Sequence, residues 1–191
     1  MSSLASVVIG VTGLPASGKG VFAEIAKQHG FIVIVMGDVI REEVRKRGLP
    51  VNREHSNKIM IELRKEHGEG VVALKTIPWV KEALNKGNHR ILIDGLRSLT
   101  EAEILRQQFP EFLIIGIHAS PKVRYDRIRS RHRKDDSSTW DEFHKRDELE
   151  LSVGIGDLLA LSDILVSNQG NIEEAKKQFD EVISDVLDLF R

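Results

Sequence analysis

The segment at residues 7–26, VVIGVTGLPASGKGVFAEIA, constrains the fold of this chain more than any other. The apolar residues at its start predict a buried strand, and the amphipathic pattern at its end predicts a helix. A glycine-rich turn between a strand and a helix binds phosphate, because backbone N–H groups and the positive end of the helix dipole point at the anion. Lys19 adds a mobile positive charge. The segment therefore predicts an α/β fold whose first strand leads into a phosphate-binding loop.

This loop departs from the usual phosphate-loop pattern at its end. The pattern G-x-x-x-x-G-K-[ST] places a hydroxyl group after the lysine, where it binds Mg²⁺. Gly20 stands at that position, so the loop has no hydroxyl for the metal there. The predicted nucleotide-binding residues are Gly13, Pro15, Ala16, Ser17, Gly18, Lys19, Gly20 and Val21.

The composition narrows the classes of protein to which the chain can belong. Its 191 residues are enough for one domain with a sizeable core. The 28 Lys and Arg residues balance 29 Asp and Glu, so the chain is not a globally basic nucleic-acid-binding protein. Cysteine is absent, which excludes disulfides, thiolate zinc sites and cysteine nucleophiles. Because we find no signal-peptide pattern and no apolar stretch of membrane-spanning length, we expect a cytoplasmic protein.

Apolar runs alternate with helical patterns along the rest of the chain, which is typical of a parallel sheet covered by helices. The predicted strands cover residues 7–11, 31–35, 91–93, 112–118 and 164–166. The predicted helices cover residues 19–29, 37–47, 53–67, 71–86, 99–108, 140–151 and 172–190, and one more begins at Pro121. We expect a single domain over residues 1–191, with a five-stranded parallel sheet in a three-layer α/β/α arrangement.

Charged residues follow the predicted strands at the sheet edge where such folds bind ligands. Asp94 would face the phosphates there and hold Mg²⁺ through water, a role made larger by the missing hydroxyl at Gly20. Arg41 lies one helical turn after Asp38, and Arg97 lies shortly after Asp94; each arginine would bind a second phosphate group bidentately. The alternative interpretations are a turn or cap residue for each carboxylate and a solvated surface residue for each arginine.

An arginine-rich segment covers residues 122–134 and contains a single acidic residue, Asp126. Two interpretations are open: a nucleic-acid-binding patch, or a basic lid that closes over transferring phosphates and excludes water. Tyr125 is the one interleaved aromatic residue and the net charge is near neutral, which both count against nucleic acid. A solvated charged helix would account for several of these arginines.

The order of these motifs resembles that of the adenylate kinases. Residues 13–20, GLPASGKG, resemble their G-x-P-x-S-G-K-G loop, and residues 37–41, GDVIR, resemble the T-G-D-x-x-R of their monophosphate-binding helix. Residues 94–97, DGLR, resemble their D-G-F-P-R with one residue fewer. Residues 133–136, RKDD, followed by Lys145 and Arg146, resemble the R-x-D-D…K-R of their lid.

The end of the chain resembles a second family of kinases. Residues 160–170, ALSDILVSNQG, are similar to the A-D-x-V-I-x-N-x-G end of dephospho-CoA kinases. As a whole the chain is most similar to the archaeal adenylate-kinase-related proteins that stand between these two families.

The resemblance implies a phosphate-loop (P-loop) NTPase core, a helical acceptor-binding insert at about residues 37–87 and a lid at about residues 122–150. It also implies ATP and Mg²⁺ as cofactors. The implied catalytic residues are Lys19, which neutralises the β- and γ-phosphates, and Arg127, Arg133 and Arg146, which close on the transferring group. The implied acceptor-binding residues are Asp38, Arg41 and Arg97, with Asp94 as the metal-binding residue, through water.

Three departures from the adenylate kinase pattern concern the identity of the acceptor more than nucleotide binding. Val21 stands where that loop has a second hydroxyl, and Met36 stands where the acceptor motif has Thr. The turn from Asp94 to Arg97 is one residue short. The acceptor, the preference for ATP or GTP and the oligomeric state therefore stay open.

The predicted function is transfer of the γ-phosphoryl group of ATP to a nucleoside monophosphate or a related phosphate-bearing small molecule, including one like dephospho-CoA. The alternative is a nucleotide-binding regulator or slow ATPase that acts with RNA or protein, with residues 122–134 as the contact surface. Arg41 and Arg97 favour the kinase, because an ATPase does not need a second set of phosphate-binding arginines.

Overall fold

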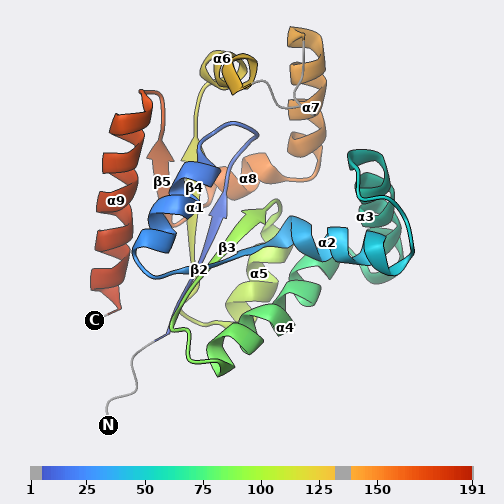
Figure 1. Cartoon of the computed structure of the whole chain (residues 1–191), viewed down its shortest axis with the longest axis horizontal. Coiled ribbons are helices and arrows are strands. Elements are labelled where there is room, and N and C mark those ends of the chain that lie inside the picture. Colours follow the sequence, from blue (N-terminus) through green and yellow to red (C-terminus); the bar gives the residue numbers. More distant parts are fainter. Residues whose placement is uncertain (1–5, 132–138, 191) are drawn as a thin grey trace.

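The computed structural model describes residues 6–131 and 139–190, which form a three-layer α/β fold (Figure 1). Its five parallel strands are β1 (Val7–Thr12), β2 (Ile32–Val35), β3 (Arg90–Leu96), β4 (Leu113–His118) and β5 (Ile164–Ser167). They lie in the order β2-β3-β1-β4-β5, so the strand that leads into the glycine-rich turn is at the centre of the sheet. The predicted fold class is confirmed.

Helices cover both faces of the sheet. They are α1 (Lys19–Gln28), α2 (Met36–Lys46), α3 (Arg53–His67), α4 (Val71–Asn85), α5 (Leu99–Gln108), α6 (Pro121–Arg131), α7 (Trp140–Ser152), α8 (Ile155–Ala160) and α9 (Ile172–Leu189). Figure 1 shows α1 and α9 on one side of the sheet, α4 and α5 on the other, and α6 and α7 beyond the carboxyl ends of the strands. Among the helices of the described residues, none is long and apolar enough to cross a membrane.

The central strand is buried on both faces, and its side chains alternate between two apolar cores. Ile9 and Val11 pack with Phe22 of α1 and Phe179 of α9, whose rings meet edge to face with centroids 5.4 Å apart. Val8 points to the opposite core, which α2, α3, α4, α5 and α8 complete. Every residue of β1 is buried. This explains why the strand is a continuous apolar run in the sequence.

Strand β3 is longer than predicted, and this changes the position of Asp94. The strand continues through Asp94 to Leu96 instead of ending at Asp94 and Gly95. Its register with β1 shifts by one residue after Asp94, which pairs with Val11, and Gly95 has a φ of +103° in the irregular step. A glycine adopts this left-handed conformation without steric cost. Asp94 is therefore held by ladder hydrogen bonds rather than by a free turn.

Helix α8 was not predicted from the sequence. It has six residues, too few for a helical periodicity to stand out. It packs between α5 and β4 and contributes Leu158 to the core of α4 and α5.

A buried ion pair joins α6 to α7. Arg124 is 1% exposed, and its guanidinium donates to both carboxylate oxygens of Asp147 and to the backbone oxygens of Ala119 and Pro15. The same guanidinium lies 5.0 Å from the centre of the Phe143 ring. Arg124 is therefore a structural residue at the base of the predicted lid.

We expect the Asp147→Ala substitution to lower the free energy of unfolding by about 3–5 kcal/mol, because it leaves the Arg124 charge buried and uncompensated. Urea denaturation measures this difference. The control is Glu24→Ala, which removes an exposed ion pair with Lys27 and should change the midpoint little. Equal midpoints for the two variants would contradict a stabilising role for the buried pair.

Candidate functional site

The glycine-rich loop between β1 and α1 has a backbone that few other residues could adopt. Gly13 and Gly18 have φ values of +152° and +118°, and Ala16 has a φ of +64°. A Cβ atom on Gly13 would lie 2.5 Å from the oxygen of Ile117, and one on Gly18 would collide with the Asn168 amide. Both glycines are thus required by conformation and by space.

Lys19 is the first residue of α1, and its side chain folds back over the loop. Its Nζ donates to the backbone oxygen of Gly13 and, over 3.4 Å, to that of Leu14. The amine therefore lies on the concave side of the loop, where backbone N–H groups at a helix N-terminus bind anions.

Burial lowers the pKa of Lys19 from 10.5 to about 8. The carboxylates of Asp94 and Glu150 act in the opposite direction, and the guanidinium groups of Arg97 and Arg146 add to the lowering. A bound anion would favour the protonated amine, since opposite charges stabilise each other. A phosphate bound at the loop would therefore raise the pKa of Lys19 and keep its amine protonated.

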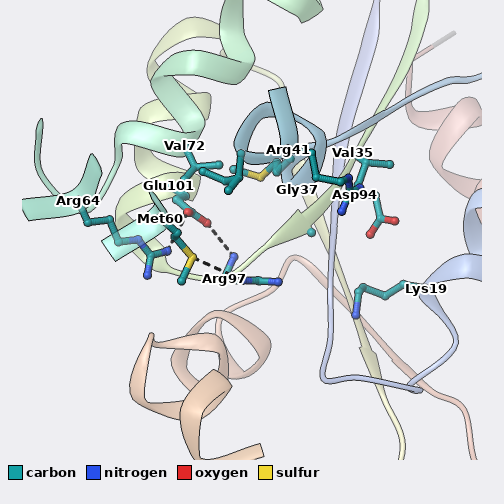
Figure 2. A pocket seen from close by; sticks show the side chains of 13 residues that line it. Lys19, Val35, Gly37, Arg41, Met60, Arg64, Val72, Asp94, Arg97 and Glu101 are labelled. Carbon is teal, nitrogen blue, oxygen red and sulfur yellow. Dashed lines mark hydrogen bonds and ion pairs between the residues drawn. The ribbon is translucent and has the colours of Figure 1, made fainter. Parts of the chain in front are cut away.

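One pocket of about 210 Å³ is lined by residues between Lys19 and Glu101, from several helices and strands (Figure 2). Its lining residues are Lys19, Val35, Met36, Gly37, Ile40, Arg41, Met60, Arg64, Val72, Asp94, Gly95, Arg97 and Glu101. Among these are the lysine of the loop, the predicted metal-binding aspartate and two predicted acceptor-binding arginines. The structure thus places these four side chains around the same cavity.

Asp94 lines this pocket, and one of its carboxylate oxygens has no hydrogen-bond partner. Its Oδ1 is buried and has no hydrogen-bond partner, and burial raises the pKa of Asp94 while Lys19 and Arg97 oppose the rise. A metal-bound water is a donor that would satisfy this oxygen. Among the described residues, no group of three His, Asp or Glu side chains lies close enough to ligate a metal directly. This donor set fits Mg²⁺, which keeps several waters in most protein sites.

Arg41 and Asp38 pair with each other on α2. Arg41 Nε and Nη2 both lie 2.7 Å from Asp38 Oδ1, and both side chains are partly exposed. Val35 precedes α2 as the N-cap residue and makes no side-chain cap, so Asp38 is a first-turn residue and not the helix cap. Its carboxylate orients the guanidinium beside Gly37 at the pocket wall.

Arg97 connects three elements around the pocket. Its backbone N–H donates to Glu101 Oε2 at 2.8 Å, its Nε lies 3.4 Å from Glu150 Oε2 of α7, and its Nη1 lies 3.8 Å from the Met60 sulfur of α3. Sequence analysis did not identify Glu101 and Glu150 as site residues. The Ser98-x-x-Glu101 capping pattern was the available signal for Glu101, whose N–H donates to the Ser98 hydroxyl. No local pattern indicates Glu150.

Arg127, predicted to be catalytic, does not line this pocket. Its guanidinium donates to the backbone oxygens of Ala16 and Ser17 in the loop, and to Asn168 and Gly170 between β5 and α9. Burial lowers its pKa. In this structure Arg127 therefore stabilises the phosphate loop through its carbonyl groups.

The two other predicted catalytic arginines have different positions. Arg133 lies outside the described residues. Arg146 lies on α7, close enough to Lys19 that its charge lowers the pKa of the amine. The structure thus brings Arg146 near the loop lysine, and Arg127 to the loop carbonyls.

Comparison with known proteins places the chain among P-loop proteins. A family model described as an AAA domain matches residues 12–144. A UPF0200 protein of Methanothermobacter thermautotrophicus is 46% identical over 177 residues, which cover 93% of this chain and 89% of that protein.

Two solved structures have the same fold. The Thermus thermophilus protein TT1252 matches with a TM-score of 0.66 at 17% identity, over 95% of this chain and 98% of that one. A shikimate kinase from Bacteroides thetaiotaomicron matches with a TM-score of 0.60 at 14% identity, over 96% and 99%. The fold is therefore that of the P-loop kinases.

We expect the stability of the protein to rise with pH through the titration of Lys19. The folded state releases this proton near pH 8 and the unfolded state near 10.5, so the unfolded state binds more protons in that interval. Between about pH 7 and about pH 9.5, the free energy of unfolding of the wild type should rise relative to that of Lys19→Met. Urea denaturation at each pH measures the difference. Lys27→Met, an exposed position on the same helix, is the control and should run parallel to the wild type.

Proposed function

The chain belongs to the UPF0200 family, and from that premise we propose that it transfers the γ-phosphoryl group of ATP to a nucleoside monophosphate or a related phosphate-bearing small molecule. The observation that carries the proposal is the shared pocket. Lys19 and Asp94, suited to a nucleotide phosphate and its metal, line the same cavity as Arg41 and Arg97, suited to a second phosphate. A protein that only hydrolysed ATP would need the first pair alone.

The donor would bind at the loop. Backbone N–H groups of the loop and the N-terminus of α1 would hold its β-phosphate, and the Lys19 ammonium would reach the γ-phosphate. Mg²⁺, when bound with the nucleotide, would neutralise charge on the β- and γ-oxygens, held on the protein side by Asp94 through water. The unpaired Oδ1 of Asp94 supports this position for the metal.

The acceptor would bind between α2 and the turn after β3. Arg41 and Arg97 now pair with the carboxylates of Asp38 and Glu150, and all four are partly accessible. An acceptor phosphate would compete for the two guanidinium groups, each of which offers a bidentate donor pair. Until the acceptor binds, the ion pairs with Asp38 and Glu150 keep the two guanidinium groups oriented.

Transfer would require positive charge and little proton chemistry. When the acceptor is a monophosphate, its phosphate oxygen is already ionised near neutral pH, so no general base is needed to activate it. Lys19, and Arg146 from α7, would stabilise the negative charge on the transferring group. Arg127 would act indirectly, because its hydrogen bonds fix the loop conformation. Arg133 would also stabilise the charge on the transferring group.

The alternative function with RNA has less support. Two of the arginines in residues 122–134 that would contact RNA have internal partners: Arg124 is buried against Asp147, and Arg127 binds loop carbonyls. A phosphate backbone would have to displace these contacts.

The kinase proposal predicts that a nucleoside monophosphate will stimulate ADP formation from ATP. A panel of monophosphates and dephospho-CoA, each tested with ATP and Mg²⁺, identifies the acceptor class by product analysis. Lys19→Ala should lower turnover at least about a hundredfold, because it removes a charge that is matched to the transition state. Acceptor-independent hydrolysis, with no phosphorylated product, would select the slow ATPase instead. Full activity in Lys19→Ala would exclude both.

Asp94→Asn should weaken the dependence on Mg²⁺ without preventing nucleotide binding. The amide keeps the size of the side chain and loses the charge that would hold the hydrated metal. We expect the Mg²⁺ concentration at half-maximal rate to rise about tenfold or more, while the affinity for metal-free ATP does not fall. Asp126→Asn, an exposed aspartate on α6, is the control. An unchanged Mg²⁺ profile in Asp94→Asn would remove this residue from the metal site.

A further inference from the structure

Arg64 lines the pocket at the end remote from Lys19 and belongs to none of the predicted motifs (Figure 2). It lies on α3, and its side chain is 10% exposed. Its Nη2 donates to Glu101 Oε1 over a long 3.4 Å. Its Nε is closed off from solvent and has no hydrogen-bond partner; the carboxylate of Glu69, 3.6 Å away, is beyond hydrogen-bond distance.

The charge of Arg64 is already compensated by a carboxylate, but its Nε donor has no hydrogen-bond acceptor. The side chain of Glu101 is 2% exposed and supplies the negative charge beside the guanidinium. Because Glu69 adds a second carboxylate 3.6 Å from Nε, a further carboxylate or phosphate at this end would be repelled. What the guanidinium lacks is an acceptor atom, because a buried N–H group without one is costly. A neutral group with acceptor atoms would satisfy it.

The wall around Arg64 is apolar. Met60 of α3, Met36 and Ile40 of α2 and Val72 of α4 line the same cavity. Thioether and aliphatic groups pack well against the faces of an aromatic ring, and methionine sulfur makes favourable contacts at ring edges. The group that fits here therefore has apolar faces and a polar edge. A planar heteroaromatic ring has both.

We propose, building on the proposed kinase function, that Arg64 determines the identity of the acceptor by donating to the oxo edge of a purine base. A 6-oxopurine presents two adjacent acceptors, O6 and N7, that match a guanidinium bidentately. A 6-aminopurine presents an amino donor in place of O6, which faces the Arg64 donors unfavourably. The guanidinium turns from Glu69 toward the pocket when the base enters.

The experiment compares the binding of inosine and adenosine monophosphates, which match in size and differ at position 6 of the ring. Isothermal titration with the whole protein gives both dissociation constants for the wild type, Arg64→Lys and Arg64→Met. The wild type should bind inosine monophosphate about tenfold tighter or more, and guanosine monophosphate similarly. Arg64→Met should bring the ratio of the two constants close to one, and Arg64→Lys should reduce the ratio. Arg64→Lys keeps the charge and loses the planar pair of donors.

Arg47→Lys is the matched control. Arg47, at the end of α2, pairs at 2.6 Å with Glu62 of α3 and does not line the pocket, so the ratio should stay at the wild-type value. Unchanged ATP affinity shows that each variant is folded. A merely structural role for Arg64 would weaken both monophosphates equally and leave the ratio intact, which would overturn the inference.

Binding and turnover separate this inference from the proposed function. Equal affinity of the wild type for the two monophosphates, or no binding of either, would overturn the role of Arg64. Tight binding of inosine monophosphate through Arg64 without phosphorylated product would support the inference and count against the kinase. Phosphorylation of both monophosphates at equal rates, insensitive to Arg64→Lys, would support the kinase and exclude Arg64 as its specificity residue.

Discussion

The phosphate loop depends on donors that come from distant parts of the chain. The carbonyl oxygens of Pro15, Ala16 and Ser17 in this loop accept hydrogen bonds from side chains elsewhere in the chain. Asn168 Nδ2 donates to the oxygen of Ser17 at 2.7 Å, Arg127 donates to the same oxygen and to that of Ala16, and Arg124 donates to that of Pro15. The segment after β5 and helix α6 thus hold the loop in shape before any ligand binds. The loop is therefore preorganised, and ligand binding does not have to supply the free energy of ordering it.

The sequence was sufficient to predict the sheet and the gathering of Lys19, Asp94, Arg41 and Arg97, because each of them lies in a short local pattern near the carboxyl end of a strand. In a parallel sheet the carboxyl ends of neighbouring strands share one edge, so local patterns give global positions. The ends of the strands were less predictable. Strand β3 continues past its expected end because Gly95, with its positive φ, permits an irregular step in the strand.

Contacts between side chains of different helices could not be predicted from short sequence patterns. Arg64 meets Glu101 across 37 residues of sequence, and Glu150 meets Arg97 across a still longer separation. The rotation and height of α3 and α7 against the sheet decide these pairs, and both are set by apolar packing that no short motif encodes. The contacts of Arg127 were equally beyond local patterns. The resemblance to adenylate kinases implies a catalytic role for it, and in the structure its guanidinium contacts backbone oxygens of the loop and of Gly170.

Helix α7 presents three charged residues, one helical turn or less apart, to three different parts of the site. Asp147 binds Arg124, Glu150 lies beside Arg97, and the charge of Arg146 acts on Lys19. At the start of this helix Trp140 is 42% exposed and its ring lies 5.1 Å from that of Tyr125 on α6. Any shift of α7 against α6 changes that ring contact. The fluorescence of Trp140 would therefore report such a shift without an attached dye.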